Sequence, residues 1–102
     1  MEPGYEVIED TLIVYVPRGL DHHSAKAVRE YADSMIKKEP IRNIVFDFSD
    51  TVFMDSSGVG MIMGRYRLIK DREGFAGMRG AGPAIRRILE ISGLYKILQV
   101  CG

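Results

Sequence analysis

Residues 43–48 (NIVFDF) constrain the fold more than any other stretch of this chain. After Asn43 the run is apolar except for Asp47. Such a run suits a strand at the centre of a sheet that helices cover on at least one face. Stretches with helical periodicity stand on both sides of it, so we expect an α/β domain built around one sheet.

The N-terminal half predicts a β-hairpin followed by a helix. Residues 5–9 and 11–16 have strand patterns, and a hairpin turn should join them. A helix over residues 24–38 should follow, capped by Asp21 or Ser24. Its apolar positions recur at helical spacing, and they are Val28, Tyr31, Ala32 and Met35.

The segment after the central strand predicts a loop and a second helix. After a loop at residues 50–55, a helix should run from Ser57 or Gly58 to about residue 71. Its apolar face should consist of Val59, Ile62, Met63, Tyr66 and Ile69.

The last third predicts a strand, a helix and a strand. Residues 75–80 should form a strand despite their glycines, and a third helix should begin at Pro83 and end at Gly93. Residues 96–100 should form the last strand. The order is then ββαβαβαβ, a mixed sheet of four or five strands in a single domain of 102 residues.

Composition excludes several function classes. Fourteen Lys and Arg balance fourteen Asp and Glu, which disfavours binding to a nucleic-acid backbone. A basic run in the second helix is expected to form a solvated face, and it consists of Arg65, Arg67, Lys70 and Arg72. The single Cys101 cannot close an internal disulfide. With no signal peptide and no run of ~18 apolar residues, we expect a cytoplasmic protein without a membrane segment.

The stretch Phe53-Met54-Asp55-Ser56-Ser57-Gly58-Val59-Gly60 joins the central strand to the second helix. A helix N-terminus has unpaired N–H groups and attracts anions, so a phosphate attached to a serine there would be well placed. On this local feature alone, serines that only cap the helix are the simpler interpretation.

Enzymatic and ligand-binding interpretations fit this stretch poorly. A nucleophile elbow needs Gly-x-Ser-x-Gly, and neither serine has the preceding glycine. The glycines at 58, 60 and 64 do not have dinucleotide-site spacing, and they are expected to permit close helix packing. His22 and His23 lack the further ligands of a metal site, so we expect no metal, no cofactor and no enzyme.

A right-handed βαβ crossover would gather the polar loops. If the strands at 11–16 and 43–48 flank the first helix in such a unit, the loops after both strands emerge at one sheet edge. Asp21, His22 and Ser56 then become neighbours. That edge is where open α/β sheets usually receive ligands.

The chain resembles the STAS-domain anti-sigma factor antagonists of Gram-positive bacteria, especially the sporulation branch. The resemblance extends over nearly the whole chain. It rests on GLDHHSA at 19–25, FMDSSGVG at 53–60 with GRY at 64–66, PAIRRIL at 83–89 and SGLYKI at 92–97. Two departures are the glycine-rich segment 75–80 and the end at Gly102, where relatives generally continue into a helix.

The resemblance implies a phosphorylation switch at Ser56. An anti-sigma factor with serine kinase activity would bind the unmodified protein and release a sporulation sigma factor. Phosphorylation by that partner would inactivate the protein, and a PP2C-type phosphatase would reverse it. The implied partner-binding residues are Asp21, His22, Asp55, Ser56, Ser57, Gly58 and Gly60. Two alternatives are an antagonist of the general-stress branch and a nucleotide- or anion-binding STAS module.

Overall fold

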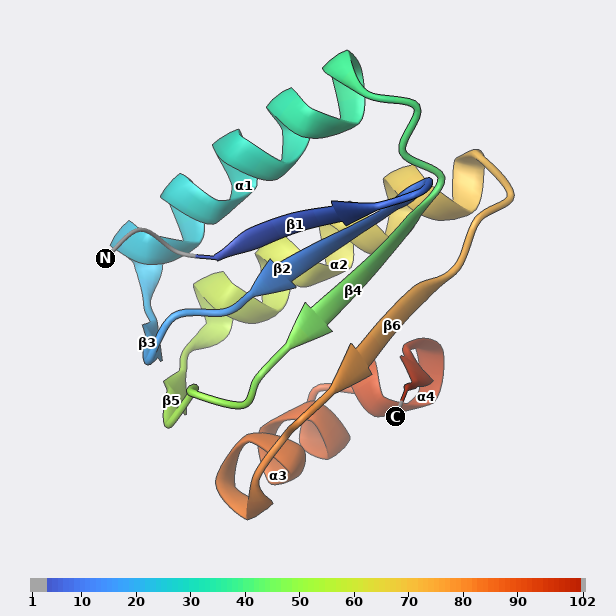
Figure 1. The fold of residues 1–102 in the computed structure, drawn as a ribbon. Coiled ribbons are helices and arrows are strands. Elements are labelled where there is room, and N and C mark those ends of the chain that lie inside the picture. Colours follow the sequence, from blue (N-terminus) through green and yellow to red (C-terminus); the bar gives the residue numbers. More distant parts are fainter. Residues whose placement is uncertain (1–3, 102) are drawn as a thin grey trace.

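The structure, a computed structural model, describes residues 4–101 and is built on a five-stranded sheet (Figure 1). The strand order is β1-β2-β4-β6-β7. β1 pairs antiparallel with β2 and all other neighbours are parallel, which confirms the predicted mixed sheet with the 43–48 run at its centre. The strands are β1 (Tyr5–Ile8), β2 (Thr11–Tyr15), β4 (Asn43–Asp47), β6 (Ala76–Arg79) and β7 (Gln99–Val100).

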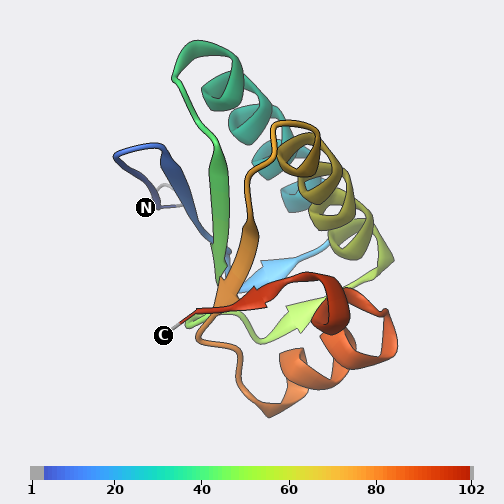
Figure 2. The ribbon, with the colours of Figure 1, turned by 90° about the vertical axis from the view of Figure 1, so that its right-hand side faces the viewer.

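Two long helices, α1 (His22–Lys38) and α2 (Ser56–Asp71), cover one face of the sheet. Figure 2 views the sheet nearly edge-on and shows both helices on the same side. The core between these layers contains alternate strand residues such as Leu12, Val14 and Phe46. Val28 and Ile62 meet them from the helices, as the predicted 3.6-residue spacing requires.

The hairpin and the first helix largely follow the prediction. Ile8 pairs with Thr11 across a two-residue turn, in which Glu9 has a φ of 57°. The prediction that Tyr31 belongs to the buried face of α1 was wrong. Tyr31 is 43% exposed, and its ring stacks on Tyr5 with centroids 3.7 Å apart, so it ties the hairpin to α1 from outside the core.

One cation of the basic run, Arg65, is not solvated, so that prediction was wrong for it. Arg65 is only 8% exposed, and its Nε lies 3.0 Å from Oδ1 of Asp33 on α1. Arg72 donates to the carbonyls of Ile36 and Ile41 at 3.3 and 2.9 Å. Arg67, Lys70 and Arg72 are exposed as expected. The arginines reach across because α1 and α2 pack side by side.

The C-terminal prediction needs one correction. α3 (Pro83–Ile91) ends near Gly93 as expected, but residues 94–97 form a short helix, α4 (Leu94–Ile97), where a strand was predicted to begin at 96. Gly93 has a φ of 86°, a left-handed conformation that glycine adopts without strain. The chain thus turns directly into α4, which buries Leu94. The last strand is therefore shortened to β7, which pairs with β6 at the edge of the sheet.

Two very short strands were not predicted. β3 (Gly19–Leu20) and β5 (Phe53–Met54) form a separate parallel pair, and β5 lies within the stretch predicted as a loop. Two residues are too few to show a period. Among residues 4–101, no helix combines the length and apolarity needed to cross a membrane.

Candidate partner-binding site

The pairing of β3 with β5 brings the starts of α1 and α2 together. Leu20 pairs with Met54, and the N–H of Asp55 donates to the carbonyl of Leu20 at 3.1 Å. The residues that follow these strands, Asp21 and Asp55, begin the two helices. In Figure 1 both short strands lie at the same end of the sheet. The predicted neighbourhood of Asp21, His22 and Ser56 is therefore present.

Asp21 caps α1 and settles the choice left open between Asp21 and Ser24. Its Oδ1 accepts from the backbone N–H of Ser24 at 2.9 Å, and the Ser24 hydroxyl reaches back to the Asp21 N–H at 3.0 Å. This is a reciprocal capping box. The hydrogen bond from the Ser24 backbone, followed by that from its hydroxyl, lowers the pKa of the Asp21 carboxyl.

Asp55, and neither serine, caps α2. Its Oδ1 accepts from the N–H groups of Ser57 and Gly58 at 2.9 and 3.2 Å. The interpretation of Ser56 or Ser57 as caps was therefore wrong, and the helix begins at Ser56 rather than Ser57 or Gly58. The carboxylate fills the place that a bound anion would take at this N-terminus.

The two serines differ in their surroundings. Ser56 is exposed and Ser57 is half-buried. The Ser57 Oγ lies 3.4 Å from Nδ1 of His22, a weak contact between the first turns of α1 and α2. Within residues 4–101, no hydrogen bond of the Ser56 hydroxyl is found, so Ser56 offers its oxygen to solvent or to a partner.

Close packing explains only one of the three glycines. A Cβ on Gly58 would lie 2.8 Å from Cδ2 of Leu20 and 2.8 Å from Cγ of Met54, whereas Cβ atoms on Gly60 and Gly64 would meet nothing within 4 Å. The prediction is confirmed for Gly58 and wrong for Gly60 and Gly64. Gly58 allows α2 to start directly against the β3–β5 pair.

Two exposed apolar side chains precede the serines. Val52 and Phe53 are 55% and 51% exposed, although they lie only a few residues from the exposed Ser56. The sequence prediction did not select them, although a β-branched and an aromatic residue in a loop were a usable signal. Adjacent exposed apolar residues suit a protein contact.

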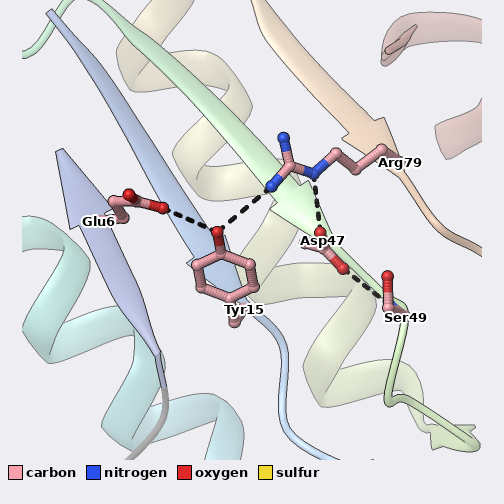
Figure 3. Close-up of polar contacts among 5 residues, drawn as sticks. All are labelled: Glu6, Tyr15, Asp47, Ser49 and Arg79. Carbon is pink, nitrogen blue, oxygen red and sulfur yellow. Dashed lines mark hydrogen bonds and ion pairs between the residues drawn. The ribbon is translucent and has the colours of Figure 1, made fainter. Parts of the chain in front are cut away.

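A second polar cluster lies on the sheet face opposite α1 and α2 (Figure 3). Nε of Arg79 donates to Oδ2 of Asp47 at 2.7 Å, and the Tyr15 hydroxyl donates to Glu6 at 2.8 Å and accepts from Arg79 at 3.3 Å. The cluster joins β1, β2, β4 and β6. It had no sequence motif, because only the strand register brings its members together.

Asp47 is the buried member of this cluster. Burial alone would raise the pKa of its carboxyl, but hydrogen bonds from Ser49 and Arg79 outweigh burial and lower the pKa. These contacts satisfy the charge that interrupts the apolar run of β4. The cluster therefore acts as a tie between strands.

The described residues offer no metal centre. Over residues 4–101, no three His, Cys, Asp or Glu side chains come together as a metal site would need. His22 and His23 are both exposed at the start of α1, and His22 faces Ser57 across the helix pair.

Comparisons with known proteins give the family. The STAS domain family model matches residues 2–101. The anti-sigma F factor antagonist of Paenibacillus polymyxa is 39% identical over 89 residues, which are 87% of this chain and 76% of that protein. The anti-sigma-B factor antagonist of Listeria monocytogenes is 26% identical over 91 residues, 89% of this chain and 79% of that protein.

Solved structures agree with the sequence relatives. The anti-sigma factor antagonist SpoIIAA in its unphosphorylated form superposes with a TM-score of 0.87 at 26% identity, covering 99% of this chain and 89% of that chain. The phosphorylated form from Bacillus gives 0.78 at 27% identity, covering 99% and 92%. With its strand order, its paired helix starts and the family match over almost its full length, this chain belongs to the STAS-domain family.

Proposed function

We propose that this protein is an anti-sigma factor antagonist: unphosphorylated, it binds an anti-sigma factor with serine kinase activity and thereby frees a sigma factor. The observation that carries the proposal is the exposed Ser56 hydroxyl at the start of α2, free because Asp55 caps the helix. The names of the relatives support the partner class. The protein acts by binding, in the cytoplasm, and catalyses no reaction.

The partner surface in this proposal is the end of the molecule where β3 and β5 pair. Asp21, His22, Asp55, Ser56, Ser57, Gly58 and Gly60 gather there, beside Val52 and Phe53. An apolar pair next to a small polar group is a typical composition for the centre of a protein interface. The partner would bury the apolar side chains and bring its bound ATP to Ser56.

Phosphorylation of Ser56 inactivates the protein in this proposal. The phosphate adds about −1.5 to −2 charges beside Asp55 and near Asp21. The Asp55 carboxylate already accepts from the N–H groups of Ser57 and Gly58, so the helix start offers the phosphate little compensation. A partner surface shaped for a neutral hydroxyl would then face repulsion and a desolvation cost. A PP2C-type phosphatase would restore the active form.

The sporulation branch is the preferred assignment. The relative named for sigma F is 39% identical and the one named for sigma B is 26% identical, and the His22-His23 pair belongs to the resemblance with the sporulation branch. The general-stress branch remains the second candidate. Affinities for the two kinds of anti-sigma factor, measured side by side, distinguish them.

The experiment that tests the proposal combines kinase and binding assays. The wild-type protein, Ser56→Ala and Ser57→Ala are incubated with ATP and the anti-sigma factor encoded in the same genome, and phosphate uptake is followed by mass spectrometry. We expect uptake by wild type and Ser57→Ala, none by Ser56→Ala, and binding by all three. Uptake by Ser56→Ala at the normal rate would move the modification to another residue. No binding by wild type would refute the function.

A further inference from the structure

A groove of about 390 Å³ runs between α1 and α2 and begins at the candidate partner-binding site. His22 and Ser57 line its near end, and both also belong to that site. Gly60 lines it as well, and because it carries no side chain the groove stays open there. A molecule that docks over Ser56 therefore lies at the mouth of this groove.

The groove is cationic. Lys26 and Arg29 from α1 and Arg65 from α2 line it, and no carboxylate does. The nearest acidic partner is Asp33, which lies 3.0 Å from Arg65 but outside the lining. Asp33 thus offsets the charge of Arg65, whereas no carboxylate in the groove lining offsets the charges of Lys26 and Arg29.

Arg65 is the buried one of the three cations that line the groove. It is 8% exposed, and its Nη1 has no hydrogen-bond partner among residues 4–101. Its Nε is close to Asp33, yet the direction is not that of a hydrogen bond. Burial lowers the pKa of Arg65 against the opposing effect of Asp33, and the neighbouring charge of Arg29 lowers it further. An unpaired buried N–H and two converging like charges both favour a bound anion.

We propose that this groove receives a carboxylate side chain of the protein partner, held by Lys26, Arg29 and Arg65. This inference rests on the proposed function, since it deepens how the anti-sigma factor is recognised. Charge complementarity supports a carboxylate. The groove continues into the candidate partner-binding site through His22 and Ser57, which supports the anti-sigma factor as the source of that carboxylate. A phosphate on Ser56 would also lower the positive potential at the groove mouth and so weaken the second contact.

The test removes the two exposed charges of the groove. Lys26→Gln/Arg29→Gln is compared with a matched control, Arg67→Gln/Lys70→Gln, which removes two exposed charges from α2 outside the groove. Calorimetry with the anti-sigma factor from the same genome is run at several salt concentrations. For the groove variant we expect about tenfold weaker binding and a shallower salt dependence. The control should change affinity less than about twofold, because surface charges away from a contact contribute little.

The outcomes separate the two proposals. If wild type does not bind the anti-sigma factor, the proposed function fails. If wild type binds and both double variants bind equally well, only the groove assignment fails. A titration of the free protein with inorganic phosphate, followed by amide NMR shifts, tests for a small-anion site. Phosphate-dependent shifts around Arg29 together with unchanged partner affinity would overturn the carboxylate assignment.

Discussion

At the start of α2, one carboxylate carries out the capping that two neighbouring hydroxyls could have done. Asp55 accepts from the N–H groups of Ser57 and Gly58, and Asp21 accepts from Ser24 in the same way at α1. The two aspartates therefore hold both helix starts. Ser56 is left with an exposed side chain that can be modified without loss of a cap.

Asp21→Asn separates the two roles that Asp21 can have. Asparagine keeps an oxygen that can cap α1 but removes the charge. We expect an unchanged midpoint in chemical denaturation together with weaker binding to the anti-sigma factor. Unchanged affinity would leave capping as the whole role of Asp21. Asp50→Asn, which removes another exposed carboxylate, is the control for a general charge effect.

Gly58 and Gly60 form a natural pair for testing close packing. A Cβ on Gly58 would lie 2.8 Å from side-chain atoms of Leu20 and Met54, and a Cβ on Gly60 would meet nothing. We expect Gly58→Ala to destabilise the protein by about 1–3 kcal/mol. Gly60→Ala should stabilise it by roughly 0.5–1 kcal/mol, because alanine is the better helix former. Urea denaturation measures both, and equal effects would contradict the packing argument.

At the level of elements, the sequence predicted the helices and strands that have a periodic pattern. It missed the contacts that depend on how distant segments pair. The amphipathic spacing predicted α1, α2 and α3, and the apolar run predicted β4 at the sheet centre. The β3–β5 pair was missed because two-residue strands have no period. Arg65 was misjudged because its charge suggested solvent, while α1 supplies Asp33 from 32 residues earlier in the chain. Val52 and Phe53 were missed because they belong to no periodic pattern, and only the tertiary structure shows that both are exposed.

The cluster at Asp47 makes the sheet sensitive to acid. The pKa of Asp47 is lowered in the folded protein, so its stabilising contribution is present above its unfolded pKa near 3.9 and is lost as the pH falls through the folded pKa. We expect Asp47→Asn to cost about 2 kcal/mol at pH 7. The difference from wild type should shrink below about pH 4.

Urea denaturation between pH 7 and pH 3 checks this expectation. Asp50→Asn removes a carboxylate that makes no ion pair within residues 4–101, so it should keep the wild-type pH profile. A difference between Asp47→Asn and wild type that is constant over the whole range would show that the charge of Asp47 does not stabilise the fold.

On the scale of the whole molecule, the proposed switch at Ser56 should act at the surface and leave the fold in place. Ser56 lies at one end of the molecule, outside the core of β2, β4 and α1. The unphosphorylated and phosphorylated forms of SpoIIAA both superpose on this chain, with TM-scores of 0.87 and 0.78. A charge added at Ser56 can therefore act on a bound partner directly, without a change in the sheet.

Ser56→Asp tests this local account. We expect its affinity for the anti-sigma factor to fall more than a hundredfold, which corresponds to a loss of about 3 kcal/mol. The thermal midpoint should stay within a few degrees of wild type, because no cap or core contact is lost. Calorimetry and a thermal melt measure the two effects. Altered hydrogen exchange across β4 would instead require a rearrangement of the sheet.

The pairing of β3 with β5 has a consequence for how partner preference can change among relatives. The segments that meet there are more than 30 residues apart in sequence, yet Val52 and Asp55 each donate a backbone hydrogen bond to the other segment. If residues 18–24 alone were replaced by those of a homologue, the homologue's helix start would lie against residues 52–60 of this chain. We expect partner preference to transfer between homologues only in chimeras that exchange residues 18–24 and 52–60 together.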